Sequence, residues 1–321
     1  MKLGAFIIPT GVGASIGGFA GDASKWARKL AEQYNLIVNP NTVNAACFSG
    51  ITENMLYTEG FTLDEFFKGN QRLLPSINNR IGLVFDKSIP TNVLNVHINT
   101  INAVKTVYDI NVIDYEITDE SVGVEFFIDN SGCSMGNVSN LITLKKATQK
   151  LVNKGCNAIA IVCHFPEDQG TDYANGIGVD PVGGVEAIIS HYISKEFKLP
   201  CAHAPAFSDI SISTDIVDKR CSAEYITPTF LPCILIGLHQ APQISEKEGY
   251  SIDDLDFLVY PANSLGGIPV LEMLKRNKKV YAIKENSTVL DVTKQNFASN
   301  VILIETYQDL LNKLNEASES H

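Results

Sequence analysis

Residues 180–187 read Asp-Pro-Val-Gly-Gly-Val-Glu-Ala, and they open a predicted helix after the apolar segment 157–163 and a loop. A glycine lets a backbone N–H approach a ligand without a Cβ in the way, and a helix N-terminus adds unpaired N–H donors. An apolar strand, a Gly-rich turn and a helix are also the repeating unit of folds with a parallel sheet. The stretch therefore predicts an α/β fold and a binding site for an anionic group.

The same pattern of strand, Gly-rich turn and helix occurs near both ends of the chain, with turns at 10–18 and 263–267. Three such units indicate turns that converge on one cleft, although glycines also serve tight turns and close helix packing. None of the turns matches a P-loop, and the first lacks the strict dinucleotide-binding pattern. The ligand contacts expected from these turns are Thr10, Gly11, Gly13, Ser15, Gly17, Gly18, Asp180, Gly183, Gly184, Glu186, Asn263, Gly266 and Gly267.

The composition is that of a globular protein. The chain has 321 residues, of which 45% are hydrophobic and 19% charged, enough for one large domain or two ordinary ones. A formal charge of −11 argues against nucleic acid or an anionic membrane as partner, because Lys and Arg lead those interfaces. Pro9 interrupts what would be a signal peptide, no apolar stretch approaches the ~20 residues of a spanning helix, and seven cysteines fit reduced thiols. The expected location is the cytoplasm.

Hydrophobic periodicity places alternating strands and helices along most of the chain. The segment 130–140 is expected to be a long polar loop, of the length of a lid. The pattern predicts a largely parallel sheet with helices on both faces, either as one unit or as two similar α/β subdomains, 1–135 and 136–321, around one cleft. Strands are expected at 35–38, 80–85, 157–163, 198–203, 255–260, 279–283 and 301–305, and helices at 62–69, from 91, at 141–153, 182–195, 226–240 and 268–276.

Polar side chains follow two of the expected strands, at the end where open α/β sheets bind ligands. Asn41 and Asn44 follow the strand 35–38. Glu285, Asn286 and Thr288 follow the strand 279–283. All five are candidate ligand contacts, although asparagine is also an ordinary turn former.

His164 and His203 each stand at the end of an expected strand, and the helix opened by Gly183 connects the two strands. Two imidazoles at one sheet edge suit acid/base catalysis near neutral pH. With Glu167, Asp168 or Asp209 they would also suit a divalent metal, although the spacing matches no metal motif. No motif in the chain requires a cofactor.

The segment Ala158-Ile-Ala-Ile-Val-Cys-His-Phe-Pro166 resembles the second-cysteine segment of cofactor-independent aspartate/glutamate racemases. Those enzymes use two thiols, from two halves of an α/β fold, to remove and return a proton. The resemblance implies that Cys163 is such a thiol, with Cys47 as its partner. The surroundings of Cys47 do not match the first-cysteine motif, and a buried cysteine is equally typical of a hydrophobic core.

Three further segments extend the comparison to nearly the whole chain. The segments 8–22, 180–187 and 284–292 resemble the bacterial and plastid-lineage family of unknown function DUF3326. The resemblance implies that the chain is one unit, and it implies no activity.

These observations predict an enzyme of small-molecule metabolism, of the isomerase, lyase or transferase class. The Gly-rich helix N-termini would hold a carboxylate or phosphate, and His164 or His203 would move protons. The alternatives are a two-thiol racemase or epimerase and a nucleotide- or metabolite-binding protein without catalysis. The expected partner is a small anionic metabolite, neither nucleic acid nor membrane, and a homo-oligomer is left open.

Overall fold

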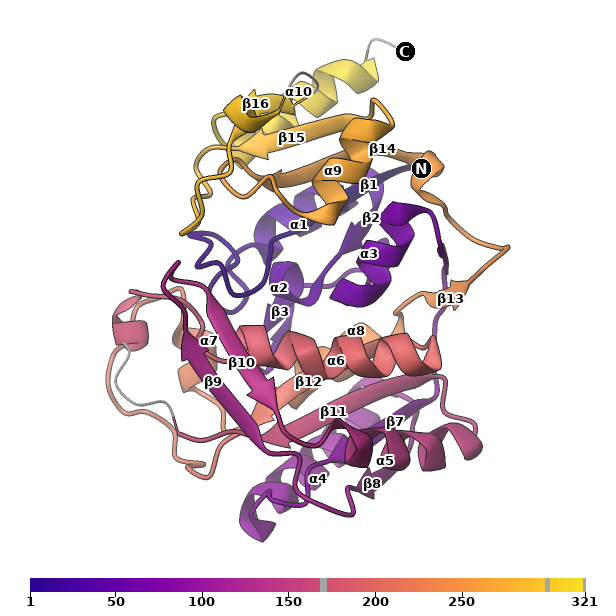
Figure 1. The fold of residues 1–321 in the computed structure, drawn as a ribbon, viewed down its shortest axis with the longest axis vertical. Helices are drawn as coiled ribbons and strands as arrows, with labels where there is room; N and C mark the ends of the chain where they lie inside the picture. Colours follow the sequence, from indigo (N-terminus) through magenta and orange to yellow (C-terminus); the bar gives the residue numbers. More distant parts are fainter. Residues whose placement is uncertain (168–171, 298–300, 320–321) are drawn as a thin grey trace.

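The strands form two separate parallel sheets, which Figure 1 shows one above the other. The computed structural model describes residues 1–167, 172–297 and 301–319. The first sheet has the spatial order β16 (Val301–Ile304), β15 (Lys279–Ile283), β14 (Leu255–Pro261), β1 (Lys2–Phe6), β2 (Tyr34–Val38) and β5 (Met55–Tyr57). The second has the order β12 (Cys201–Ala206), β11 (Ala158–His164), β7 (Ile81–Phe85) and β8 (Val112–Ile117). Neighbouring strands run parallel throughout both sheets, which confirms the expected α/β class.

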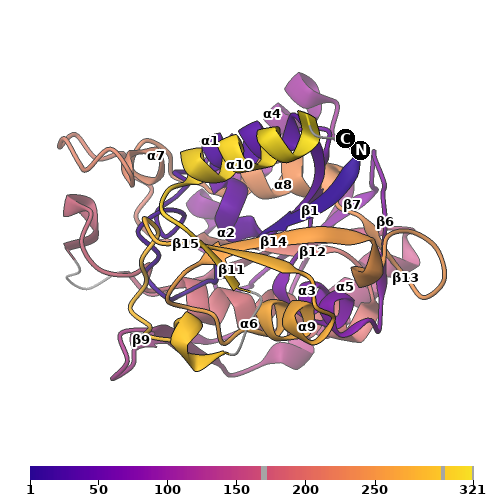
Figure 2. The ribbon, with the colours of Figure 1, turned by 90° about the horizontal axis from the view of Figure 1, so that it is seen from above.

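Helices cover both faces of each sheet. On the first sheet, α1 and α10 lie side by side on one face and α3 and α9 on the other (Figure 2). On the second sheet, α5 and α6 pack on one face and α4 and α8 on the other. In the described ranges, no helix is both long enough and apolar enough to cross a membrane. The helices are α1 (Ser24–Ala31), α2 (Pro40–Val43), α3 (Gly60–Lys68), α4 (Thr91–Tyr108), α5 (Leu141–Asn153), α6 (Gly183–Phe197), α7 (Ser222–Tyr225), α8 (Leu231–His239), α9 (Ile268–Lys275) and α10 (Tyr307–Glu319).

The apolar strands are interior because both of their faces are covered. Ala158 to Cys163 of β11 are all buried. Ile159 and Ile161 pack in the core under α5 and α6, whereas Ala160 and Val162 pack in the core under α4 and α8. This alternation fixes the face on which each residue of β11 lies.

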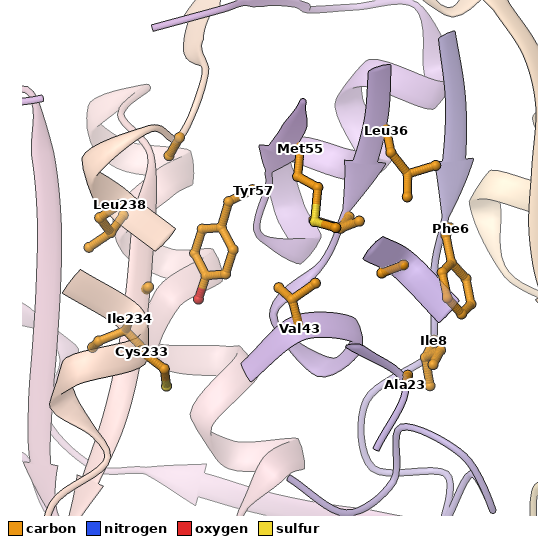
Figure 3. Packing of buried hydrophobic residues seen from close by; sticks show 14 of the residues in the cluster. Phe6, Ile8, Ala23, Leu36, Val43, Met55, Tyr57, Cys233, Ile234 and Leu238 are labelled. Atoms are coloured by element: carbon orange, nitrogen blue, oxygen red, sulfur yellow. The ribbon is translucent and has the colours of Figure 1, made fainter. Parts of the chain in front are cut away.

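The two sheets share one hydrophobic core. The helix α8 packs on β11 and β12 and also contacts the short hairpin of β3 (Asn44–Ala45) and β4 (Phe48–Ser49), which follows β2. Figure 3 shows Tyr57, at the end of β5, pointing from the first sheet toward Cys233, Ile234 and Leu238 of α8. We call each sheet with its helices a lobe, and this shared core joins the two lobes.

The chain passes from the first lobe to the second and back again. The outward passage runs through β6 (Arg72–Leu74) and the return through β13 (Gln243–Ser245), and these two strands pair antiparallel. The last three strands of the first sheet therefore come from residues 255–304. The lobes divide the chain differently from the boundary expected near residue 135, because β14 pairs with β1 across most of the sequence.

The segment 130–140 is not the long loop that its polar composition predicted. Residues Ser134–Val138 form β10, which pairs antiparallel with β9 (Val124–Ile128) in a two-stranded ribbon. Gly132 has a φ of +83° in the turn between them, a conformation that favours glycine. The strand was missed because an exposed ribbon needs few apolar side chains, so its pattern resembles that of a loop.

Candidate functional site

A cavity of about 610 Å³ lies between the two lobes. Residues that follow β1, β2 and β5 line it from the first lobe, and residues that follow β11 and β12, with α6 and α8, line it from the second. The cavity therefore lies outside the carboxyl ends of parallel strands, where α/β proteins bind ligands. The lining residues expected from the sequence are Thr10, Gly18, Asn41, Asn44, Asp180, Gly183, Glu186 and His203.

The first and second Gly-rich turns meet at this cavity, with β10 between them. The backbone N–H of Ser134 donates to the carbonyl oxygen of Gly11, at 2.8 Å. A Cβ at Gly183 would lie 3.1 Å from Cγ2 of Thr10, so these two backbones are close neighbours. The convergence expected from the sequence is present for these two turns, across two sheets rather than at the edge of one.

The third Gly-rich turn and the segment after β15 do not line this cavity. The Asn263 side chain instead hydrogen-bonds with Thr288 and with the carbonyl oxygen of Leu290. Asn286 is fully buried and bonds with both backbone groups of Ile16. The Asn286 contacts fasten the first turn to the first sheet, since buried backbone groups need hydrogen-bond partners. The Asn263 contacts fasten the third turn to the segment after β15. The expected ligand residues that lie outside the cavity lining are Gly11, Gly13, Ser15, Gly17, Gly184, Asn263, Gly266, Gly267, Glu285, Asn286 and Thr288.

Part of the N-terminus of α6 is satisfied within the protein. The N–H of Gly184 donates to Oγ of Ser134 at 3.0 Å, and that hydroxyl donates to the carbonyl oxygen of Pro181 at 2.7 Å. The N–H of Val182 donates to Oδ1 of Asp180. A Cβ at Gly184 would overlap the carbonyl oxygen of Ser134, so this glycine permits the close packing of α6 on β10. The Gly184 amide is therefore not available to the anionic ligand expected there.

The charges around the cavity are acidic. Among the described lining residues there is no lysine or arginine, and the carboxyl groups are Glu59, Glu167, Asp180, Glu186, Asp209 and Glu224. Burial, and then repulsion from Asp180, raises the pKa of Glu224 to about 8. Burial, and then repulsion from Asp180 and Glu224, holds the pKa of Glu186 well above its usual range. Burial therefore favours the protonated forms of Glu186 and Glu224.

Glu186 and His203 lie side by side on the wall of the cavity. Oε2 of Glu186 lies 3.8 Å from Nε2 of His203, and the two side chains keep 9% and 17% of their exposure. Burial lowers the pKa of His203 to about 3, so its ring is neutral. The Ser190 hydroxyl donates to the carbonyl oxygen of Ala187 and lies 2.9 Å from Nδ1 of His203. A Ser190 hydroxyl that donates to Ala187, at 3.4 Å, accepts from Nδ1, and in that tautomer the free lone pair of the ring lies on Nε2, toward Glu186.

His164 does not join this pair. The strand register pairs His203 with Ile161 and His164 with Ala206. Because side chains alternate along a strand, His164 lies on the opposite face of the sheet from His203. Its Nε2 lies 2.8 Å from the Ser208 hydroxyl, outside the cavity lining.

Cys163 lies in the hydrophobic core under α5 and α6 and does not line the cavity. Burial raises the pKa of its thiol well above the usual range, which disfavours the reactive thiolate. Cys47 is also absent from the cavity lining. The two-thiol alternative therefore has no support from this geometry.

Several lining residues were not found from the sequence. The Tyr173 hydroxyl donates to Oε1 of Glu224 at 2.9 Å, and both residues come from short helical turns, Asp172–Asn175 and α7, which are too short to show a periodic pattern. Glu59 accepts hydrogen bonds from the first N–H groups of α3 and faces His191 at 3.8 Å. The carboxylate before a helix was the one available signal, and it points to a capping role.

A metal set is not assembled in the part of the chain that the structure describes, where no group of three or more His, Cys, Asp or Glu side chains is placed to hold an ion. Asp168, one of the ligands expected beside His164, lies outside the described residues.

The fold and the cavity define a class: an α/β protein of two parallel sheets with an acidic, partly apolar pocket between its lobes. The chain belongs to the family described as protein of unknown function (DUF3326), whose model matches residues 4–317. It is 37% identical over 296 residues to an uncharacterised lipoprotein of Synechococcus sp. (strain ATCC 27144 / PCC 6301 / SAUG 1402/1), covering 89% of this chain and 82% of the relative. No solved structure matches the chain.

Proposed function

We propose that this protein is an enzyme that moves a proton on a small metabolite bound between the lobes, with Glu186 as the acid and His203 as the base. The supporting observation is that a carboxyl whose pKa is raised by burial and an imidazole whose pKa is lowered by burial lie 3.8 Å apart on one cavity wall. Oε1 of Glu186 is buried without a hydrogen-bond partner among the described residues, and an unpaired buried polar atom destabilises a fold. Buried titratable groups with strongly shifted pKa values, such as Glu186, cluster at functional sites.

The pair suits isomerisation or elimination. Nε2 of His203 would take a proton from the substrate, and Glu186 would give one to the substrate or to its leaving group. Ser190 would hold the imidazole in the tautomer that accepts on Nε2. The cavity therefore supports the isomerase and lyase classes over the transferase class among those expected from the sequence.

The lining favours a neutral or cationic substrate. Carboxylates that stay ionised, such as Asp209, would repel a carboxylate or phosphate, and no lysine or arginine among the described lining residues would attract one. Phe19, Phe207, Phe230 and Ile234 add an apolar wall that suits a hydrocarbon part. We therefore revise the anionic metabolite expected from the sequence to a hydroxylated or aminated small molecule.

The test is deuterium incorporation from solvent. The protein would be incubated with a small-molecule cell extract in D₂O, and metabolites that gain mass or change in abundance would be followed by mass spectrometry. We expect labelled or converted metabolites with the wild-type protein and a loss of about 100-fold or more in rate with Glu186→Gln. Glu167→Gln is the matched control, because Glu167 is an exposed carboxyl of the same cavity. Equal labelling by the wild-type protein and Glu186→Gln would contradict the proposed role of Glu186. Ligand binding without any conversion would favour the metabolite-binding alternative.

A cytoplasmic location stays our proposal, since the seven cysteines are free thiols in the structure. The name of the Synechococcus relative points to lipid anchoring of that protein. Cell fractionation with an antibody against this chain separates the two cases, because an anchored form would sediment with the membranes.

A further inference from the structure

A second cavity, of about 580 Å³, lies on the other side of a loop that it shares with the first. Gly18, Phe19 and Ala20 line the first cavity, whereas the next two residues, Gly21 and Asp22, line the second. The short hairpin after α2 is shared in the same way, with Ala46 on one side and Ala45 and Phe48 on the other. The two cavities are therefore neighbours separated by a thin wall.

The second cavity is basic. Lys25 and Arg28 of α1 line it together with Lys219 and Arg220, and Asp22 is the one carboxyl among the described lining residues. Four cations against one carboxylate give the lining a formal charge of +3, in a chain with a net charge of −11. This distribution is the opposite of that in the first cavity.

One of these cations is fixed, and three are unpaired. Arg220 donates to Asp218 at 3.0 Å and to the carbonyl oxygen of Gly176 at 2.7 Å. For Lys25, Arg28 and Lys219, by contrast, no carboxylate lies within 4.0 Å in the described ranges. Three unpaired cations around one hollow repel one another unless an anion joins them.

The remaining carboxyl, Asp22, cancels at most one of the four positive charges. Oδ1 of Asp22 accepts the N–H of Gly17, which holds the carboxyl in the shared loop. Burial raises the pKa of Asp22 to about 6, so part of its population is neutral near pH 6. Phe48, which is 57% exposed, gives the cavity an apolar side.

We propose that this second cavity binds the phosphate group of a small phosphorylated metabolite between Lys25, Arg28 and Lys219. The three positively charged side chains match a phosphate monoester, with its two charges and several acceptor oxygens, better than they match a single carboxylate. Phe48 would contact the organic part of the ligand. The site is independent of the reaction proposed for Glu186 and His203, which face the other cavity.

Trp26 makes the binding observable, because it is the one tryptophan of the chain and lines this cavity. Lys25 and Lys29 both lie over its ring, at 4.8 and 5.0 Å from the centroid, but only Lys25 lines the cavity. The pair gives a matched control, since both substitutions remove one charge beside the same fluorophore.

Inorganic phosphate is titrated at constant ionic strength set with KCl, with Trp26 fluorescence and calorimetry as readouts. We expect saturable binding to the wild-type protein, about tenfold weaker binding to Lys25→Gln, and a change below about twofold in Lys29→Gln. Circular dichroism would check that the variants are folded. Equal weakening in both variants would show that phosphate responds to the general positive charge near Trp26, which would contradict the proposed site. The absence of a saturable signal in both readouts would also overturn the proposal.

Discussion

Glu224 ties the chemistry of the first cavity to stability. Its Oε1 accepts hydrogen bonds from the Ala20 N–H and the Tyr173 hydroxyl, and its pKa rises from 4.5 to about 8 on burial. Between these values the unfolded state ionises while the folded state stays protonated, so the free energy of unfolding falls as pH rises. Glu224→Gln mimics the protonated form and keeps both acceptor contacts. We expect it to raise the free energy of unfolding by about 2 kcal/mol at pH 8, after allowance for partial exposure, and to change it little at pH 4.5.

Urea denaturation at the two pH values is the measurement, and Glu167→Gln, at an exposed position, is the control. A Glu224→Gln effect that is the same at pH 4.5 and pH 8 would contradict the raised pKa.

The same scale shows which site residues a sequence can reveal. Gly183 and Glu186 were predictable because they stand at a helix start, and His203 because it follows an apolar pattern, although its strand β12 continues to Ala206. Glu224 was not, since it comes from the four-residue helix α7, which is too short for a periodic pattern and reaches the cavity only through tertiary packing. The sequence could not show that His164 and His203 lie on opposite faces of the sheet. This depends on the strand register, because a shift of one residue moves a side chain to the other face.

At the scale of elements, Ser134 joins β10 to α6. Its hydroxyl is buried, donates to Pro181 and accepts from Gly184. Ser134→Ala leaves a buried carbonyl and a buried N–H unpaired, so we expect a loss of about 2 to 3 kcal/mol in the free energy of unfolding. Thermal and urea denaturation measure it.

Ser131 is the matched control, because its hydroxyl lies in the same ribbon and binds Asp129 at an exposed position. Ser131→Ala is expected to cost less than about 0.5 kcal/mol. Similar losses in the two variants would remove Ser134 from its role as a link between β10 and α6.

Elements with strong periodicity were predicted well, and their arrangement was not. The apolar strand 157–163 and the helix from residue 91 match β11 and α4 closely. The division into two sheets could not be predicted from local sequence patterns, because the pairing of Leu3 with Leu255 depends on which distant strand packs best. The polar strand β10, with the sequence SMGNV, carries too little hydrophobic signal to be recognised.

At the scale of the whole molecule, the core around Tyr57 and α8 makes the lobes one cooperative unit. Tyr57→Ala would leave a cavity between the lobes, and we expect a loss of about 3 to 5 kcal/mol. Trp26 fluorescence reports on the first lobe, and far-ultraviolet circular dichroism reports on both. Because the core is shared, the urea midpoints from the two probes should coincide and should fall together in the variant.

Tyr108→Ala is the control, since Tyr108 is 59% exposed at the end of α4. Separate midpoints for fluorescence and dichroism in the wild-type protein would show that the lobes unfold independently.

The pairing of β1 with β14 has a further consequence during synthesis. The strands of the second sheet all come from the continuous stretch 81–206. Leu3 of β1, in contrast, can pair with Leu255 only after that residue has been synthesised. At translation rates of about 5 to 20 residues per second, this wait of roughly 250 residues lasts on the order of 10 to 50 s. During that time an apolar strand edge in the nascent chain has no partner, and such edges recruit other chains. The ribosome-bound intermediate is thus the stage at which this protein most needs a chaperone.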